Sequence, residues 1–440
     1  MQLAVQGLRM TADTGREKES VGGGRAGGFR PEYAVEHGPA ISRGSNQTGV
    51  RAYNERLVLS LVRRRGALPR AEIARLTGLS AQTVSVIMRG LEEDGLLMRG
   101  ERVRGRVGQP STPMRLAAEG VFSFGLKIGR RSAELILMDF IGNIRMRLHE
   151  TYRWPVPDAI RKFTLDGIGR FSASLDAAQR RRIAGLGIAV PFELWNWVEE
   201  VGAPQADLDA WRDADLVREF GAHFPFPVFM QNDATAACGA ELTFGRGPDF
   251  TDFVYFFIGS FIGGGVVLNN ALYAGRTGNA GAVGSMPVPG PAPDHVPGKR
   301  SRPRQLIDAA SVFVLERMLQ ERGDDTTALW LSPENWEDFG APVDEWIALT
   351  ARNLAHATVA AASVIDFSAA IIDGWLPASV RHRIVEATRA ELAGLDLQGI
   401  AAPEIVEGKV GVHAKAVGAA SLPLFNRYLF DQSVLFKEAV

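Results

Sequence analysis

Four polar residues between positions 80 and 90 have the side-chain types and the spacing of groups that contact DNA bases. Gln82, Ser85 and Arg89 recur every three or four residues, so a helix would place them on one face, and Thr83 lies in its first turn. Amide, hydroxyl and guanidinium groups on an exposed helix can hydrogen-bond base edges and phosphates in the major groove. The pattern therefore predicts a DNA-recognition helix.

The surrounding sequence predicts the helices that would position this one. An earlier helix is indicated by an apolar stripe with helical spacing, namely Leu57, Val58, Leu61 and Val62. Pro69 can open a second helix, in which Arg70 is a further expected DNA contact, and Gly78 supplies a tight turn. Ser80 is a suitable N-cap for the recognition helix and is also an expected DNA contact. The buried stripe of the recognition helix is expected to consist of Val84, Ile87, Met88 and Leu91.

A basic hairpin, or wing, is expected to follow the recognition helix. Strand residues 96–98 and 114–116 flank a glycine-broken turn in which Arg104, Arg106 and Gln109 are expected to contact phosphate or enter a minor groove. Residues 51–115 contain 13 arginines, no lysine and six acidic residues, a net charge of +7, whereas the whole chain carries −1. This concentration of charge favours double-stranded DNA as the partner over the alternative, a helical module that binds protein.

Length and composition bound the rest of the chain. The 440 residues, 46% of them hydrophobic, are enough for several domains with sizeable cores. The single cysteine, Cys238, excludes an internal disulfide and a cysteine-rich zinc site. The sequence has no run of about 18 apolar residues and no signal core, so we expect a cytoplasmic protein without a membrane partner. Residues 1–46 lack apolar periodicity, and we expect a disordered tail that either adds weak phosphate contacts or is inert.

From Val121 onward the pattern is that of an α/β body. Apolar runs typical of buried strands alternate with helical stretches, and these runs are 122–128, 133–138, 183–190, 228–230, 253–258 and 369–372. A long helical pattern covers 343–364. We therefore expect a winged helix-turn-helix over 47–117, a first lobe over 118–240, and a second lobe over 241–440 whose last helix can return to the first lobe.

The order of the motifs resembles one family. A winged helix-turn-helix ending in Arg-Gly-Arg-Val-Gly-Gln-Pro precedes a body with six glycine- or polar-residue segments, which are 124–129, 187–191, 231–234, 259–265, 278–285 and 418–420. Over about residues 50 to 425 the chain resembles the ROK family (repressor, open reading frame, kinase), specifically its transcription-regulator branch. The resemblance implies a two-lobed, actin-like and sugar-kinase-like ATPase fold, with a cleft between the lobes.

The resemblance also implies roles for the segments. Segments 124–129 and 259–265 stand where family kinases receive phosphate. Asn232 and Asp233 stand where an Asn and an Asp hold the sugar, the Asp being the general base. Segment 278–285 stands where a sugar-binding Glu and His are usual. The remaining two segments match the strand below the sugar, 187–191, and the start of the C-terminal helix, 418–420.

The chain departs from the family pattern at the residues that would do chemistry. Lys127 replaces an acidic residue that orients the magnesium–phosphate complex, and a cation can pair with phosphate but cannot ligate Mg²⁺. Ala282 replaces the Glu and Ser285 replaces the His that would contact sugar and zinc. Ile307 falls about where another sugar-binding Glu is usual. The zinc segment is replaced by a Pro- and Arg-rich loop, 287–304, whose His295 is more simply explained as solvated than as a ligand.

We therefore expect a DNA-binding transcriptional regulator, a repressor of sugar-related metabolism as the resemblance implies, with a degenerate kinase-like body that senses a sugar or a sugar derivative. The alternative is an ATP-dependent sugar kinase with an added DNA-binding domain, in which Asp233 would be catalytic. No metal and no cofactor are expected, and the family implies a homodimer or homotetramer. The expected ligand contacts are Asn232, Asp233, Gly259, Ser260 and Ser285.

Two further expectations concern the cleft. Asp233 is interpreted as a cap of the helix that starts at Ala234 and as a ligand contact, rather than as a base. With Ala282, Ser285 and Ile307 in place of charged groups, the pocket is expected to be more apolar than a hexose site and to bind plain glucose weakly or not at all. Packing is favoured over sugar stacking for three tryptophans, Trp195, Trp197 and Trp211.

Overall fold

A computed structural model describes residues 47–101, 112–192, 194–197, 202–276, 278–290, 302–331 and 336–430. The first of these ranges begins with three helices, α1 (Gln47–Arg65), α2 (Arg70–Thr77) and α3 (Ala81–Glu93). Gly78 ends α2 in the left-handed conformation at φ 69°, which a residue without a Cβ adopts at little cost. An antiparallel pair of short strands, β1 (Leu97–Arg99) and β2 (Met114–Leu116), follows α3. Residues 47–117 are called the head below.

The apolar stripes of the head form its core, as the sequence predicts. Val58 and Val62 of α1 are buried against Ile73 of α2 and the four stripe residues of α3. Ser80 is the N-cap of α3, and its hydroxyl accepts a hydrogen bond from the Thr83 N–H at 3.1 Å. The cap and the buried stripe together fix which face of α3 remains exposed.

The first sheet of the body contains five strands in the order β5-β4-β3-β6-β7. The strands are β3 (Phe122–Ile128), β4 (Ser132–Asp139), β5 (Ile144–Thr151), β6 (Ile183–Val190) and β7 (Val228–Asn232). β3 pairs with β6, and β6 with β7, in parallel, while β4 is antiparallel to both of its neighbours. The helices that accompany this sheet in the described part of the chain are α4 (Pro157–Ser174), α5 (Ala177–Arg180), α7 (Gln205–Asp209) and α8 (Leu216–His223).

The second sheet has the order β10-β9-β8-β13-β14. Its strands are β8 (Phe253–Ile258), β9 (Gly263–Leu268), β10 (Ala271–Leu272), β13 (Ala369–Gly374) and β14 (Glu404–Glu407). The helices that follow β9 are α10 (Ile307–Ala310), α11 (Val312–Glu321), α12 (Thr327–Leu331), α13 (Ala341–Ala362) and α14 (Ala378–Ala393). A small pair of strands, β11 (Pro287–Val288) and β12 (Arg304–Gln305), lies before α10.

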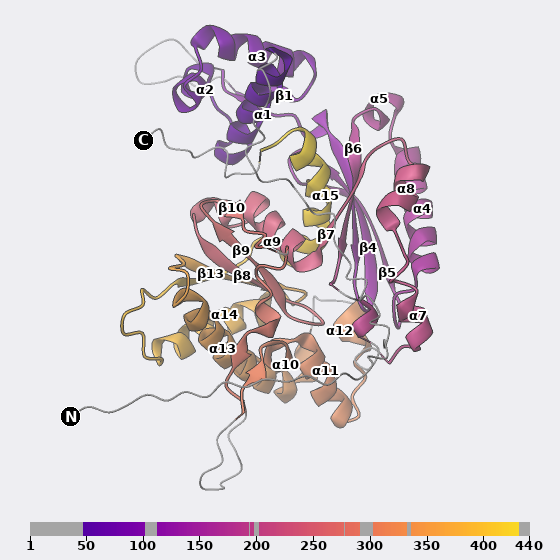
Figure 1. Ribbon diagram of the computed structural model, residues 1–440, viewed down its shortest axis with the longest axis vertical. Helices are drawn as coiled ribbons and strands as arrows, with labels where there is room; N and C mark the ends of the chain where they lie inside the picture. The colour runs from indigo at the N-terminus through magenta and orange to yellow at the C-terminus, as the bar shows by residue number, and fades with distance from the viewer. Residues whose placement is uncertain are drawn as a thin grey trace, which may run out of the picture. The chain divides into compact units, whose positions relative to one another are not determined.

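Two helices occupy the space between the sheets (Figure 1). α9 (Asp233–Phe244) packs against β8 and β9, and α15 (Ala414–Arg427) packs against β3, β4, β6 and β7 as well as against α9. Segment 418–420, expected to start the C-terminal helix, instead lies inside α15, which begins at Ala414. The predicted boundary between residues 240 and 241 falls inside α9. The described helices include none long and apolar enough to cross a membrane.

Candidate functional site

The exposed face of α3 is the candidate DNA-binding surface. Gln82 and Arg89 are exposed on it, and Arg70 is exposed at the start of α2. Val86 lies one helical turn after Gln82 and is 56% exposed, although its side chain is apolar. Val86 is not among the predicted contacts, because these are polar residues; its position four residues from Gln82 is the signal that places it on the same face.

The hydroxyl groups of α3 are engaged within the helix. The Ser80 and Thr83 hydroxyl oxygens lie 2.8 Å apart, and the Ser85 hydroxyl donates to the Ala81 carbonyl at 2.8 Å. Ser85 is only partly exposed, so the structure places it beside the exposed face rather than at its centre. The wing residues expected to contact DNA, Arg104, Arg106 and Gln109, lie outside the described residues. Gln82 and Arg89 are thus the best exposed of the predicted contacts on α3.

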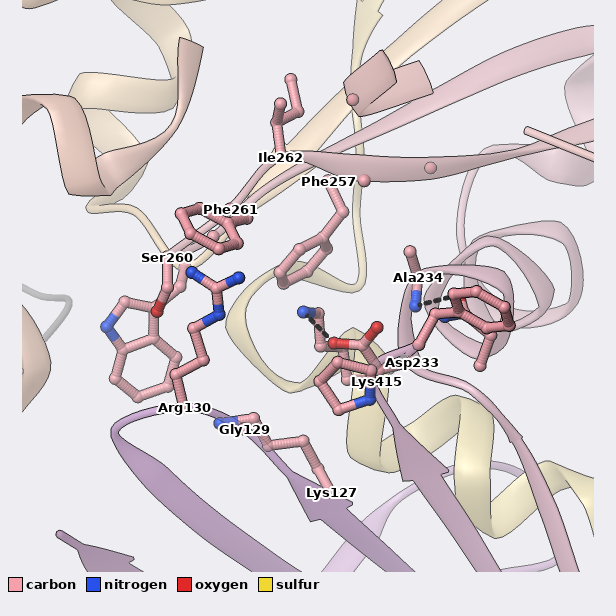
Figure 2. Close-up of a pocket in the computed structure, with 18 of the residues that line it drawn as sticks. Lys127, Gly129, Arg130, Asp233, Ala234, Phe257, Ser260, Phe261, Ile262 and Lys415 are labelled. Atoms are coloured by element: carbon pink, nitrogen blue, oxygen red, sulfur yellow. Dashed lines mark hydrogen bonds and ion pairs between the residues drawn. The ribbon is translucent and has the colours of Figure 1, made fainter. Parts of the chain in front are cut away.

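A cavity of about 310 Å³ lies between the two sheets of the body. All five expected ligand contacts line it, and they are Asn232, Asp233, Gly259, Ser260 and Ser285. Lys127, Ala282 and Ile307, the positions where the chain departs from the family pattern, line it as well. The structure therefore brings together segments that are more than 150 residues apart, while the binding role of each residue stays a prediction. Figure 2 shows part of the cavity wall.

Asp233 is not the helix cap that the sequence suggested. Asn232 is the N-cap of α9, and its side-chain oxygen accepts from the N–H groups of Ala234 and Thr235, both at 3.1 Å. Asp233 is the first residue of α9, and its carboxylate forms an ion pair with the ammonium of Lys415 in the first turn of α15 (Figure 2). The cap is Asn232 because an N-cap precedes the first helical residue, and α9 begins one residue earlier than expected.

Lys127 extends from the end of β3 into the cavity wall. Its ammonium donates to the Ser132 carbonyl at 3.0 Å and to the Ser132 hydroxyl at 2.9 Å. Burial lowers the pKa of Lys127 to about 8, and the nearby Lys415 ammonium acts in the same direction, whereas Glu134 and Asp233 oppose it. Lys127 therefore sits where a positive charge is poorly hydrated.

Glu134 is the second carboxylate of the cavity wall, and two basic side chains contact it. The Arg147 guanidinium donates to it at 2.5 Å, and the His413 Nδ1 lies 2.8 Å from the same oxygen. Burial by itself raises the pKa of Glu134, but the hydrogen bond with His413 and the charges of His413, Arg147 and Lys127 outweigh it and lower the pKa. No sequence pattern predicts this group, because His413 and Glu134 are far apart in the chain.

Aromatic side chains and one arginine close another side of the cavity. Arg130 is buried, and its guanidinium carbon lies 2.7 Å from the ring centroid of Phe261 and 3.5 Å from that of Trp197 (Figure 2 shows Arg130 beneath Phe261). Trp211, by contrast, is buried in the first lobe and donates its indole N–H to the Pro155 carbonyl at 3.0 Å. Trp211 is thus packed in the core, as expected, whereas Trp197 lines the cavity.

The glycine segment 259–265 is only partly a loop. Residues 263–265 belong to β9, where Gly264 pairs with Phe256 of β8, so the turn consists of residues 259–262. The Ile262 N–H donates to the Ser311 hydroxyl at 3.0 Å. Consecutive glycines concealed this strand, since glycine normally weakens one.

Asp373, where the family resemblance places a Gly-Gly pair near the adenosine, carries a fully buried carboxylate. It accepts hydrogen bonds from the Gly411 N–H at 2.9 Å and the Tyr255 hydroxyl at 3.2 Å, and the Arg381 guanidinium lies 3.3 Å away. Burial and the charge of Glu241 raise the pKa of Asp373 to about 6, against the effect of Arg381. The described residues include no group of three or more His, Cys, Asp or Glu placed to hold a metal.

Comparison with known proteins gives two family matches. The model of the ROK family matches residues 123–424, and a model described as winged helix-turn-helix DNA-binding matches residues 51–98. Among solved structures, a ROK family transcriptional regulator homologous to the E. coli MLC protein has a TM-score of 0.61 at 19% identity, over 88% of this chain and 98% of that one. A ROK family glucokinase from Streptomyces griseus has a TM-score of 0.52 at 22% identity, over 68% of this chain and 98% of that one. Both show the fold alone.

Curated relatives include proteins named as repressors. The xylose repressor of Bacillus spizizenii is 28% identical over 244 residues, which are 56% of this chain and 62% of the repressor. The regulator NagC of Escherichia coli is 23% identical over 246 residues, which are 54% of this chain and 58% of NagC. The protein y4fQ of Sinorhizobium fredii is 25% identical over 390 residues, which are 85% of this chain and 91% of y4fQ. The chain thus spans about three fifths of the length of the two named regulators.

Proposed function

Because the chain belongs to the ROK family and carries a winged helix-turn-helix ahead of its family domain, we propose that it is a sequence-specific, DNA-binding repressor of carbohydrate-related genes. The observation that carries the proposal is the exposed face of α3, where Gln82, Val86 and Arg89 project from a helix whose opposite face is buried. Such a helix fits the major groove. The name of the Bacillus relative, a xylose repressor, supports a sugar-related role, and that of the Escherichia relative supports transcriptional regulation.

Selection of operator fragments from genomic DNA tests this proposal. The full chain is expected to enrich a small set of fragments that share a sequence, because base contacts on α3 discriminate among sites. Equal binding of genomic fragments and random DNA at moderate salt would contradict the proposal, since phosphate contacts alone give no sequence preference.

Replacing Gln82 by alanine is expected to relax the sequence choice and to weaken operator binding by about 1–3 kcal/mol. The cause is the loss of an exposed amide that can pair with a base edge. The measurement is a binding titration against operator variants, with Gln205→Ala, an exposed glutamine of the body, as the matched control. An unchanged sequence preference for Gln82→Ala would remove this residue from the base contacts.

The route from cavity to head runs through α9 and α15 in this proposal. Both helices begin at the cavity, and their far ends contact α1 of the head. The Arg56 guanidinium donates to the Phe425 carbonyl at 2.9 Å and to the Leu429 carbonyl at 2.6 Å. The Arg63 guanidinium lies over the Phe244 ring, 4.0 Å from its centroid. A ligand that favours one arrangement of these helices would therefore change the DNA affinity of the head.

Two copies of the head, in a homodimer or homotetramer, would read paired half-sites in this proposal. The proposal is supported by a general rule: a symmetric pair of heads binds an operator whose two half-sites are related by the same two-fold symmetry. The partner is thus double-stranded DNA, with a small-molecule effector bound in the body.

We further propose that the cavity binds its ligand without phosphorylating it. Lys127 replaces the metal-orienting acid, and Asp233 forms an ion pair with Lys415. Asp373 stands where the resemblance implies a glycine near the adenosine. A coupled assay with ATP, magnesium, hexoses and N-acetylated hexosamines is expected to show no turnover above that of an Asp233→Asn variant, because phosphoryl transfer depends on positioned metal and charge. Turnover that Asp233→Asn abolishes would instead favour the kinase alternative.

A further inference from the structure

Cationic side chains outnumber carboxylates in the cavity wall. Lys127, Arg130, Arg131 and Lys415 line the cavity, against two acidic residues, Glu134 and Asp233. The cleft is therefore more charged than the motifs predicted, because Arg130, Glu134 and Lys415 lie outside the segments from which a ligand site was expected. Arg131 has a partner of its own, since the Glu316 carboxylate lies 3.8 Å from its guanidinium. A buried cation that lacks such a partner costs free energy.

Both carboxylates already have partners within the protein. Glu134 is bound by Arg147 and His413, and Asp233 is bound by Lys415. Among the ion pairs of the described residues, none within 4.0 Å involves Lys127. Its ammonium has three N–H donors, and the described contacts to Ser132 use two of them. One donor of a positively charged group therefore remains at the cavity.

The backbone adds to this positive potential. α9 and α15 have 12 and 14 residues, and both begin at the cavity, with Asp233 and Lys415 in their first turns. The N-terminal end of a helix carries a partial positive charge that favours anions. Asp233 lies at the N-terminal end of α9 and is already paired with Lys415. It therefore does not serve as a counter-ion in contact with Lys127.

We propose that the ligand of this cavity is anionic, a small molecule whose phosphate or carboxylate group accepts hydrogen bonds from Lys127. The proposal rests on the proposed function, since it names the chemical class of the effector of that same site. The uncharged part of the ligand would lie against the aromatic wall, to which Phe257, Trp197 and Trp375 contribute. A phosphate and a carboxylate share the acceptor geometry that the ammonium requires.

Calorimetric titration of the full chain separates the two anionic groups and the neutral case. The probes are glucose 6-phosphate, glucuronate, inorganic phosphate and glucose. At least one of the anionic sugars is expected to bind about tenfold or more tightly than glucose, because a charge-assisted hydrogen bond contributes about that much to affinity. Lys127→Met, which keeps most of the length of the side chain and removes its charge, is expected to abolish that difference. Lys162→Met, at an exposed lysine of α4, is the control.

A second arm uses the unaltered protein. Since the pKa of Lys127 is about 8, anion affinity is expected to fall as the pH rises through that value, and binding near it is expected to take up protons. Proton uptake makes the observed enthalpy depend on the ionisation enthalpy of the buffer. The pH arm stands even if Lys127→Met does not fold.

Three results would overturn the proposal: anionic sugars that bind no better than glucose, anions that bind Lys127→Met as well as the native chain, or no binding of any anionic probe at millimolar concentration. None of these results would contradict the DNA-binding proposal, because operator selection tests that proposal in the absence of ligand. Loss of operator preference with intact anion binding would overturn the regulator function alone.

Discussion

Replacing Gly418 by alanine is expected to destabilise the body by about 3 kcal/mol or more, the upper end of the cost of overpacking a core. Gly418 lies where α15 crosses α9. A Cβ at this position would be 1.9 Å from the carbonyl oxygen of Ala236 and 2.3 Å from its carbonyl carbon. Both are backbone atoms, so no side-chain rotation relieves the overlap, and one of the two helices must move.

Urea unfolding followed by tryptophan fluorescence measures this effect, as a lower midpoint relative to the native chain. Gly169→Ala in α4 is the matched control, because this glycine is also helical and nothing lies within 4 Å of its ideal Cβ. The control is expected to be neutral or to stabilise by up to about 1 kcal/mol, the difference in helix propensity. Equal midpoints for the two variants would show that α9 and α15 do not approach as closely as described.

Much of the framework was predictable from the sequence because it rests on local patterns. The strands β3, β6 and β8 have the predicted bounds, since each is a largely apolar run of the kind that a sheet covered on both faces requires. The stripe and the Ser80 cap of α3 are likewise confirmed, because helical spacing and a capping hydroxyl are local signals. The family and the winged helix-turn-helix are confirmed by the matching models.

Elements without such a pattern were missed. β5 alternates between partly buried and exposed residues and carries three charged side chains, so no apolar run marks it. β9 begins with three glycines and was interpreted as a loop. In both cases pairing with a neighbouring strand supplies the stability that the local sequence does not, and that pairing is set by the tertiary structure.

The chemistry of the cavity was the least predictable part. Three residues of the motif segments, Asn232, Ser260 and Ser285, line one cavity, while their role in binding stays a prediction. Three of the charged groups, however, lie outside those segments: Arg130 in the turn after β3, Glu134 in β4 and Lys415 in α15. Asp233 and Lys415 are 182 positions apart, and an ion pair between residues so distant leaves no periodic trace in one sequence. The altered residue Lys127 was visible, but its partners were not.

Replacing Asp233 by alanine is expected to destabilise the body by about 3 kcal/mol, because it leaves the Lys415 ammonium in a poorly hydrated place without its counter-ion. The two side chains of the pair are only 9% and 15% exposed. Lys415 would then face Lys127 with one acid fewer between the two cations. The measurement is the urea midpoint, compared with that of a double variant, Asp233→Ala with Lys415→Met.

The double variant is expected to recover most of the lost stability, since it removes both charges and keeps an apolar chain of similar length in the wall. Recovery would separate the loss of a charge partner from simple loss of packing around Asp233, which the double variant shares. The result also decides whether Asp233 can act as a general base. A carboxylate held in an ion pair is not free to take a proton from a sugar hydroxyl. If Asp233→Ala is as stable as the native chain, the ion pair contributes nothing to stability, and Asp233 is free to act as a base in phosphoryl transfer.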